Sequence, residues 1–296
     1  MHRYINCIAH KASEGNLLLG KTFTALFDCG MAFCARETIR NVKNALGGKP
    51  LDYLFITHTH YDHIGAFPFF KKEWPRICLV CSVPGAEILQ KDTPRRVIRE
   101  LSAVAAGQYG ASDDLSYDDD IFQADITVTE GDVIPLGGVS VKVLETPGHT
   151  RDSLSFFIPE LALLILSETP GVLMPDGSIY PCYLTGFQDT VDTIQKCRQL
   201  GYRFISLPHR GIAAPELIEG YFDKALITNI ACRNFILRMA AQGLTMEEML
   251  NAFYQTYGSE LLLGYQPKEA FLANAGATIA CTLRECHPSV SPATQK

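Results

Sequence analysis

The sequence predicts an α/β fold with additional helices. Short apolar or alternating runs, typical of strands, are interleaved with periodic helical segments up to about residue 214. From Pro215 onward, helical periodicity dominates. A hydrophobic content of 47% in 296 residues is enough for a sizeable core. We therefore expect a core over 1–214 with a helical insertion at about 84–110, a helical cap over 215–286 and a disordered tail over 287–296.

The first half of the core is predicted from apolar runs and their punctuation. Gly47 to Pro50 should stop the first helix, because this glycine- and proline-rich stretch cannot continue it. The acidic stretch at 110–120 is interpreted as a solvated loop rather than a metal site. The expected elements are two or three strands within 4–30, a helix over 37–46, a strand over 51–56, a helix over 64–72, a strand over 77–82 and a helix over 84–108.

The second half continues with alternating strands and ends in helices. Pro159 and Glu160 mark the turn of an expected hairpin, and a Gly/Pro-rich loop is expected from 169 to 181. Thr245 is a good helix cap, since acidic residues follow in the first turn. The expected elements are strands over 126–128, 139–144, 153–158, 161–166 and 204–207, and helices over 190–200, 216–242, 245–257 and 268–285.

Composition narrows the class of protein. The net charge of −6 and a pI near 5.8 argue against a nucleic-acid surface. The amino terminus lacks the apolar segment of a secretory signal, and no apolar run approaches the roughly 20 residues that span a bilayer. We expect a cytoplasmic protein that does not bind membranes, and the helical region is compatible with a homodimer.

The 10 cysteines are interpreted as reduced thiols. Cys78 and Cys81 form a C-x-x-C spacing, but they lie in a predicted strand, where residues three apart face opposite sides. No second pair completes a zinc knuckle. Most of the thiols are therefore expected to be buried, as free cysteines usually are.

A cluster of histidines carries the chemistry. Thr57-His58-Thr59-His60-Tyr61-Asp62-His63 directly follows an apolar strand. Only 8 histidines occur in the whole chain, so three within six residues are unlikely to be a chance surface loop. Imidazoles and a carboxylate are ligands for zinc or iron. Because residues two apart at a strand end point the same way, His58 and His60 can share one metal, and Asp62 and His63 can face a second.

The His-x-His-x-Asp-His spacing resembles the signature of the metallo-β-lactamase fold hydrolases. Further motifs follow in that family's order. Asp28 matches an acidic residue at the end of an early strand, His149 a Gly-His turn, Glu168 a bridging carboxylate and His209 a late histidine ligand. The resemblance implies an αββα sandwich over the core, with the helical insertion and the helical cap added to it.

The resemblance also implies a set of roles around two divalent metal ions. His58, His60 and His149 would hold one ion, and Asp62, His63 and His209 the other. Glu168 would bridge them, and Asp28 would orient a histidine. Zinc is expected first, with iron or manganese as alternatives.

Two positions depart from the family's pattern. The family usually has aspartate where Glu168 stands, and glutamate is one methylene longer, so bridging of two ions is open. The family more often has Pro-Gly-His-Gly where this chain has Pro208-His209-Arg210-Gly211. Arg210 adds a positive charge that suits an anionic substrate or a surface ion pair.

The predicted function is hydrolysis of a small-molecule ester, thioester or lactone by a metal-bound hydroxide, with Asp62 and Glu168 as catalytic carboxylates. The helical segments resemble lids of small-molecule esterases, thioesterases and quinolone-signal response proteins. One alternative is a phosphodiesterase, favoured if Arg210, Lys71 or Lys72 approaches the metals. Another is a metal-containing regulatory or binding protein with incidental hydrolysis.

Overall fold

A computed structural model describes residues 3–7, 15–111 and 116–286. The predicted tail and the acids at 113 and 114 lie outside these residues. The chain divides into two compact units. The sheet unit comprises Met1–Thr146, Asp152–Ser167 and Gly201–Ile218, and the helical unit comprises Pro147–Arg151, Glu168–Leu200 and Glu219–Lys296. This division differs from the predicted boundary between 214 and 215, because two earlier segments group with the carboxyl-terminal helices. The domain assignment stays a prediction.

The first sheet of the sheet unit has six strands in chain order, from β1 to β6. β1 to β3 pair antiparallel, whereas β3 to β6 pair parallel. The parallel register places Phe27 beside Phe55, so the residues that follow β3 and β4 leave the sheet at the same edge. Its strands are β1 Arg3–Asn6, β2 Asn16–Leu19, β3 Thr24–Phe27, β4 Tyr53–Phe55, β5 Cys78–Ser82 and β6 Ile126–Val128.

The second sheet of this unit also has six strands, in the order β14-β13-β10-β9-β8-β7. The predicted hairpin around Pro159 is present, since β9 and β10 pair antiparallel across the short 3-10 helix Pro159–Leu161. β7 contains Pro135 and lies at the sheet edge, where a missing N–H is tolerated. The strands are β7 Val133–Pro135, β8 Ser140–Glu145, β9 Leu154–Ile158, β10 Leu163–Ile165, β13 Phe204–Leu207 and β14 Gly211–Ile212.

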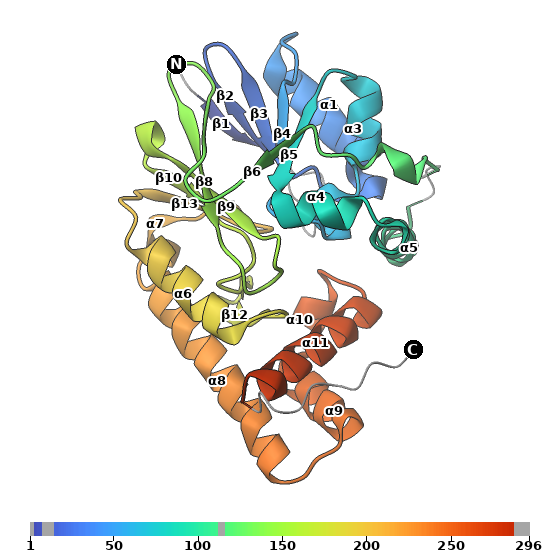
Figure 1. Ribbon diagram of the computed structural model, residues 1–296, viewed down its shortest axis with the longest axis vertical. Helices are drawn as coiled ribbons and strands as arrows, with labels where there is room; N and C mark the ends of the chain where they lie inside the picture. The colour runs from blue at the N-terminus through green and yellow to red at the C-terminus, as the bar shows by residue number, and fades with distance from the viewer. Residues whose placement is uncertain (1–2, 8–14, 112–115, 287–296) are drawn as a thin grey trace. The chain divides into compact units, whose positions relative to one another are not determined.

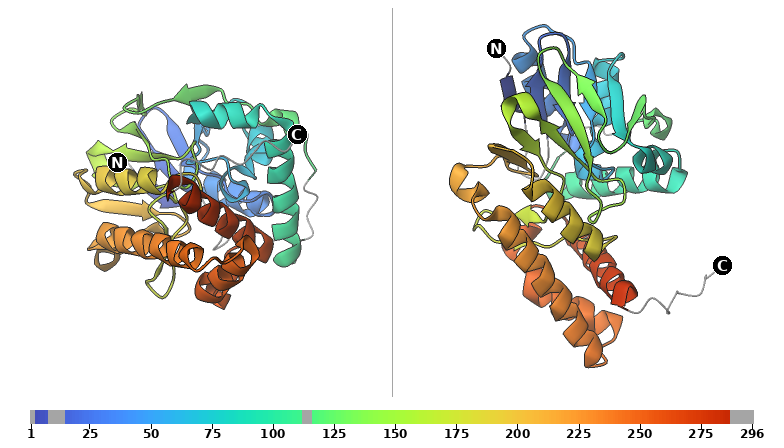
Figure 2. Two further views of the ribbon diagram at one scale, coloured as in Figure 1. Left: turned by 60° about the horizontal axis from the view of Figure 1, so that its bottom comes forward. Right: turned by 60° about the vertical axis from the view of Figure 1, so that its left-hand side comes forward.

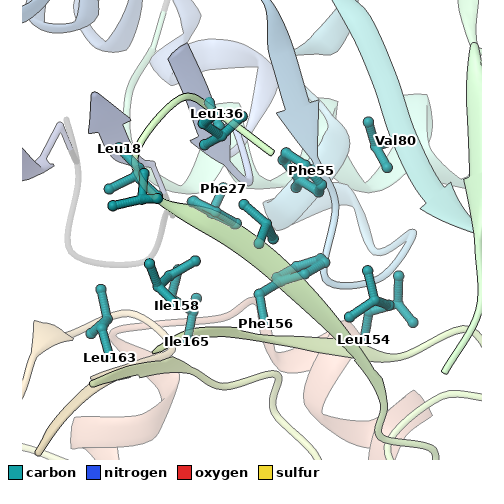
Figure 3. Packing of buried hydrophobic residues seen from close by; sticks show 14 of the residues in the cluster. Leu18, Phe27, Phe55, Val80, Leu136, Leu154, Phe156, Ile158, Leu163 and Ile165 are labelled. Carbon is teal, nitrogen blue, oxygen red and sulfur yellow. The ribbon is translucent and has the colours of Figure 1, made fainter. Parts of the chain in front are cut away.

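The core of the sheet unit lies between the two sheets. Phe27 and Phe55 of the first sheet stack with ring centroids 5.2 Å apart, and Phe156 of the second meets them at 5.3 and 5.4 Å. Figure 3 shows these rings with Leu18 and Ile165 in one apolar layer. The predicted αββα sandwich class is confirmed, since inward-facing residues of both sheets share one core.

Helices of the sheet unit begin and end where the backbone chemistry requires. Gly47 ends α1 (Ala35–Leu46) in a left-handed conformation, as expected. Two predicted helices are each broken in two, because Pro68 and Pro94 fall in a first turn, where an N–H has no helical acceptor. The segments are α2 Tyr61–Ile64, α3 Phe67–Glu73, α4 Val83–Leu89, α5 Asp92–Gln108, α7 Pro215–Ile218 and the 3-10 helices Ala32–Cys34 and Asp119–Ile121.

The helical unit is built on long helices and a small hairpin. Figures 1 and 2 show α8 and α9 beside α11, and α11 contacts both. The predicted helix over 216–242 is interrupted at Gly220, whose φ is +71°. The predicted loop after Glu168 contains the paired strands β11 Val172–Leu173 and β12 Ile179–Tyr180. The helices are α6 Phe187–Arg198, α8 Tyr221–Ala241, α9 Met246–Tyr257, α10 Glu260–Leu263 and α11 Lys268–Cys286.

The cysteines behave as the sequence predicts. All ten cysteines are free, and only Cys78 and Cys286 are partly exposed. In α5, Arg95 pairs with Asp92 and Asp120, each at 2.6 Å, and Arg99 pairs with Asp119. These cations therefore serve local ion pairs. Among the described residues, none of the helices has the length and apolar character needed to cross a bilayer.

Replacement of Phe156 by alanine should lower the free energy of unfolding by about 3–5 kcal/mol, because the side chain is fully buried and leaves a cavity. Urea denaturation monitored by circular dichroism measures the change. Phe204→Ala is the control, since Phe204 is 40% exposed and its loss should have a small effect. Equal losses in the two variants would contradict the assignment of the core.

The predicted cap of α9 is a complete capping box, in which Thr245 and Glu248 exchange hydrogen bonds. Thr245→Ala should lower the free energy of unfolding by about 1 kcal/mol. The control is Thr256→Ala in the same helix, where the hydroxyl only bonds the Ala252 carbonyl. A loss as large in the Thr256 variant would contradict the capping argument.

The same cap has a predicted pH dependence. Hydrogen bonds from the Thr245 backbone and hydroxyl lower the pKa of Glu248. The stabilisation is therefore complete above the ordinary glutamate pKa of about 4.3 and is lost as the pH falls through the lower folded-state pKa. The stability difference between wild type and Glu248→Ala should be constant from pH 6 to 8 and shrink below about pH 4. A difference that grows on acidification would contradict this sign.

Candidate metal centre

The histidine motif spans the loop after β4 and continues into α2, which contains Asp62 and His63. His58 and His63 are buried, and their ring centroids lie 4.1 Å apart. The His60 ring lies 4.6 Å from that of His58, and the His209 ring 5.3 Å from that of His63. Ligand atoms of His58 and His60 come within 4.8 Å of each other. The four imidazoles therefore gather where β4 of the first sheet and β13 of the second sheet end.

Asp62, His63 and His209 converge on one point. Asp62 Oδ2 lies 3.8 Å from the Nε2 atoms of both His63 and His209. These separations are too long for hydrogen bonds. They are near the roughly 3.4 Å that separates two ligands of a tetrahedral ion at metal–ligand distances of about 2.0–2.2 Å. The three side chains therefore have the spacing of ligands rather than of a hydrogen-bonded chain.

Asp28 holds the loop and one of its histidines. Its carboxylate accepts hydrogen bonds from the Thr57 backbone N–H at 2.7 Å and the Thr57 hydroxyl at 2.8 Å. Its Oδ2 atom also lies 2.9 Å from His63 Nδ1. Because a carboxylate accepts, Nδ1 of His63 carries the proton, and Nε2 is left with its lone pair toward Asp62. The contact between Asp28 and a histidine, on which its predicted role depends, is present.

Cys29, beside Asp28, is not a ligand candidate. Its thiol lies 3.4 Å from the His63 carbonyl oxygen, to which it donates. Burial, reinforced by the charge of Asp28, raises the pKa of Cys29 well above its ordinary value. The residue therefore remains a neutral thiol that packs against the loop.

His209 lies in the tight turn between β13 and β14. The Arg210 N–H bonds the Leu207 carbonyl at 3.1 Å, and Pro208 precedes His209, whose φ is +58°. Proline followed by a positive φ is typical of a type II turn, in which the second central residue is normally glycine. The departure from Pro-Gly-His-Gly therefore places His209 itself at the turn position that favours glycine.

His149 and Glu168 belong to the helical unit. His149 Nδ1 lies 2.7 Å from the Cys182 carbonyl, which can only accept, so Nδ1 donates and the lone pair of Nε2 can bind a metal ion or accept a hydrogen bond. Glu168 Oε2 lies 3.0 Å from that Nε2. The Glu168 carboxylate therefore lies close enough to His149 for both to bind one ion, and its bridging of two ions stays a prediction.

The turn before His149 requires glycine. Gly148 has a φ of +134°, and a Cβ atom there would lie 2.2 Å from Thr190 Oγ1. The Pro147 carbonyl accepts a hydrogen bond from Thr193 at 2.9 Å. Helix α6, which supplies both threonines, thus fixes the turn that presents His149.

Sequence reasoning missed Asp152. Its buried carboxylate accepts the Thr59 N–H at 2.8 Å, between His58 and His60. Its own backbone carbonyl accepts from the Ser82 hydroxyl at 2.9 Å. An acid three residues after His149 was the only signal in the sequence, and its partner lies 93 residues away. Asp152 fixes the backbone of the histidine loop.

The predicted site residues thus fall into two sets. The sheet unit brings together His58, His60, Asp62, His63 and His209, with Asp28 in contact with His63. The helical unit brings together His149 and Glu168. Both sets consist of the nitrogen and oxygen donors that zinc, iron or manganese accept.

The family model of the metallo-β-lactamase superfamily matches residues 16–169, which is more than half of the chain. The chain belongs to the metallo-β-lactamase superfamily. The match contains the histidine motif, Asp28, His149 and Glu168. Membership implies divalent metal ions as cofactors.

Two relatives show how far sequence likeness extends. The chain is 21% identical over 213 residues to a metallo-β-lactamase fold-containing protein of Sulfurisphaera tokodaii, covering 71% of this chain and 77% of the relative. It is 30% identical over 122 residues to a hydroxyacylglutathione hydrolase of Rhodopseudomonas palustris. That second match covers 41% of this chain and 35% of the hydrolase. The chain thus spans only about a third of that enzyme's length.

A solved structure extends the likeness in fold to nearly the whole chain. A metallo-β-lactamase family protein from Thermus thermophilus aligns with a TM-score of 0.58 and 16% identity. The alignment covers 99% of this chain and 95% of that one. At this identity the comparison supports the fold of this chain and says nothing of its substrate.

Replacement of Asp28 by asparagine should weaken metal binding about 10- to 100-fold. The NH2 group of asparagine cannot accept a hydrogen bond, so the amide cannot accept all three bonds that the carboxylate accepts. Competition with a fluorescent chelator measures the metal dissociation constant.

The matched control is Asp52→Asn. Asp52 accepts from the Thr24 N–H at 2.8 Å and hydroxyl at 3.2 Å, and joins loop and strand without touching a histidine of the motif. Equal affinity in wild type and the Asp28 variant would contradict the role of Asp28.

Proposed function

We propose that this superfamily member is a metal-dependent hydrolase of a small-molecule ester, thioester or lactone. The observation that carries the proposal is the convergence of Asp62, His63 and His209, with the tautomer of His63 fixed by Asp28. A surface loop of histidines would have neither a buried carboxylate behind one ring nor a third ligand from a distant strand. The arrangement has the features of a metal site.

The proposed centre holds two divalent ions. His58, His60 and His149 are proposed for one ion, Asp62, His63 and His209 for the other, and Glu168 as the bridge. Support comes from the order of the motifs along the chain and from the spacing within each set of side chains. The donors favour zinc, with iron or manganese as alternatives.

The chemistry follows from the residues around such a centre. When bound, the ions would lower the pKa of a water molecule to near neutrality and polarise the scissile carbonyl. Asp62, whose side chain is more exposed than that of Glu168, would orient that water and take its proton. Asp28 keeps Nε2 of His63 unprotonated, and the Cys182 carbonyl does the same for His149. These hydrogen bonds keep the imidazoles in the ligating tautomer without rearrangement.

A thioester is the substrate class that the comparisons favour. The relatives that are named hydroxyacylglutathione hydrolases are 30% and 32% identical to this chain over 122 and 111 residues, and an acylglutathione is a thioester. A phosphodiester is less well supported, because Lys71 donates to the Ile77 carbonyl at 2.8 Å and pairs with Asp125 at 3.3 Å. A small molecule in the cytoplasm is the proposed substrate.

The deciding experiment is elemental analysis of protein purified without added metal, together with a substrate screen. Wild type should contain two equivalents, and His60→Ala and Glu168→Ala should lose one or both. Turnover should fall at least about 100-fold in both variants, since even the replacement of a residue that is hydrogen-bonded to a metal ligand lowers activity 10- to 100-fold. His10→Ala is the control, because this histidine lies outside every motif.

The screen compares a glutathione thioester, a simple ester, a lactone and bis-p-nitrophenyl phosphate. Turnover of the thioester and not of the phosphodiester supports the proposal. Cleavage of the phosphodiester alone would favour the alternative chemistry. Metal-free protein that captures a partner equally well after loss of His60 would overturn the enzyme assignment in favour of a binding protein.

A further inference from the structure

A tight turn follows Glu168 in the helical unit. The Gly171 N–H bonds the Glu168 carbonyl at 2.8 Å, which closes a four-residue turn. Gly171 has a φ of +112°, and a Cβ atom there would lie 2.6 Å from Ile179 Cγ2 and 2.9 Å from the Tyr180 carbonyl oxygen. The turn is therefore held against the β11–β12 hairpin at a position that only glycine fits.

Helix α8 binds two successive carbonyls of this turn. The Tyr221 hydroxyl donates to the Gly171 carbonyl at 2.9 Å. Asn229 Nδ2 donates to the Pro170 carbonyl at 3.0 Å and to the Ala225 carbonyl of its own helix at 2.8 Å. Tyr221 and Asn229 are 3% and 0% exposed. These donors satisfy buried carbonyls that would otherwise lose their hydrogen bonds to water.

The same turn holds His149. The His149 backbone N–H lies 3.3 Å from Thr169 Oγ1, and its Nε2 atom lies 3.0 Å from the Glu168 carboxylate. Thr169 and Glu168 are the first two residues of the turn. A shift of the turn would therefore move both residues that the helical unit contributes to the proposed centre.

Packing alone does not account for these polar side chains in α8. Asparagine is a poor helix former, and an apolar residue would fill a fully buried helix position without a desolvation penalty. Burial raises the pKa of Tyr221, with smaller effects from the charges of Cys197 and Glu168, so the phenol stays protonated and remains a donor. Both side chains thus act as fixed donors to the turn.

We propose that Tyr221 and Asn229 are positioning residues of the metal centre, through which helix α8 fixes Glu168 and His149. The inference rests on the proposed function. It gives the carboxyl-terminal helices a role in the chemistry itself: α8 sets where the bridging carboxylate points. It also explains how a glutamate can serve where the family has aspartate, because its turn is fixed by three hydrogen bonds besides the one that closes it.

The test compares two tyrosine variants that each lose one buried hydroxyl in the helical unit. Tyr221→Phe removes the bond to the turn, whereas Tyr183→Phe removes a bond of 2.9 Å to the Thr282 hydroxyl. Chelator competition measures metal affinity, and thermal unfolding measures stability. Tyr221→Phe should weaken binding of at least one ion about tenfold, which is the lower end of the loss in metal affinity seen when a residue that orients a metal ligand is replaced. Tyr183→Phe should lower the melting temperature similarly and leave affinity unchanged.

A second arm asks whether the effect passes through Glu168. In a Glu168→Gln background, adding Tyr221→Phe should weaken metal binding less than it does in wild type, because effects within one coupled network are not additive. Asn229→Leu should act in the same direction as Tyr221→Phe.

The outcomes separate this inference from the proposed function. Wild-type affinity in Tyr221→Phe, with stability lowered as in Tyr183→Phe, would overturn the positioning role and leave the hydrolase proposal standing. An unchanged Tyr221→Phe effect in the Glu168→Gln background would also overturn it. Wild-type protein without metal would overturn both.

Discussion

The arrangement of the sheet-unit histidines depends on the buried carboxylate of Asp28. A charge removed from water is tolerated only when hydrogen bonds replace its hydration, and here Thr57 and His63 supply three. The Asp28 N–H in turn bonds the Phe55 carbonyl at 2.8 Å. Because β3 and β4 are parallel and in register, their ends meet at one edge, so one acid can fix the entire start of the histidine loop.

Backbone strain is concentrated in the same region. Asp28 and His209 are two of the three non-glycine residues with positive φ among the described residues, and both contact or neighbour the Asp62–His63 pair. Each such conformation costs on the order of 1–3 kcal/mol and persists only where surrounding contacts enforce it. At Asp28 the enforcing contacts are the hydrogen bonds of the carboxylate. At His209 they are the closed turn and the β13–β14 pairing. Strained backbone thus occurs at two residues that are proposed to bind or orient the ligands of the metal centre.

The sequence allowed prediction wherever the signal is local. The histidine motif, the hairpin at Pro159 and the capping box at Thr245 each lie within a few residues, so their chemistry is visible in the order of the side chains. Three predicted helices are each interrupted near Pro68, Pro94 or Gly220. The helical period of apolar residues continues across each interruption, so it does not reveal where one helix ends and the next begins. The strands β11, β12 and β14, of two residues each, are too short to leave a pattern.

Long-range partners could not be predicted. Asp152 and Thr59 are 93 residues apart, and Tyr221 and Gly171 are 50 apart. Each is one hydrogen bond between a side chain and a backbone group, and any polar residue nearby in sequence would be an equally good candidate. The proposed ligands can therefore be identified from the motif, whereas the groups that orient their side chains are determined by the fold. The family motif identifies the metal chemistry. Members of the family with the same ligands can differ in the contacts that orient those ligands, which here come from Asp152, α6 and α8.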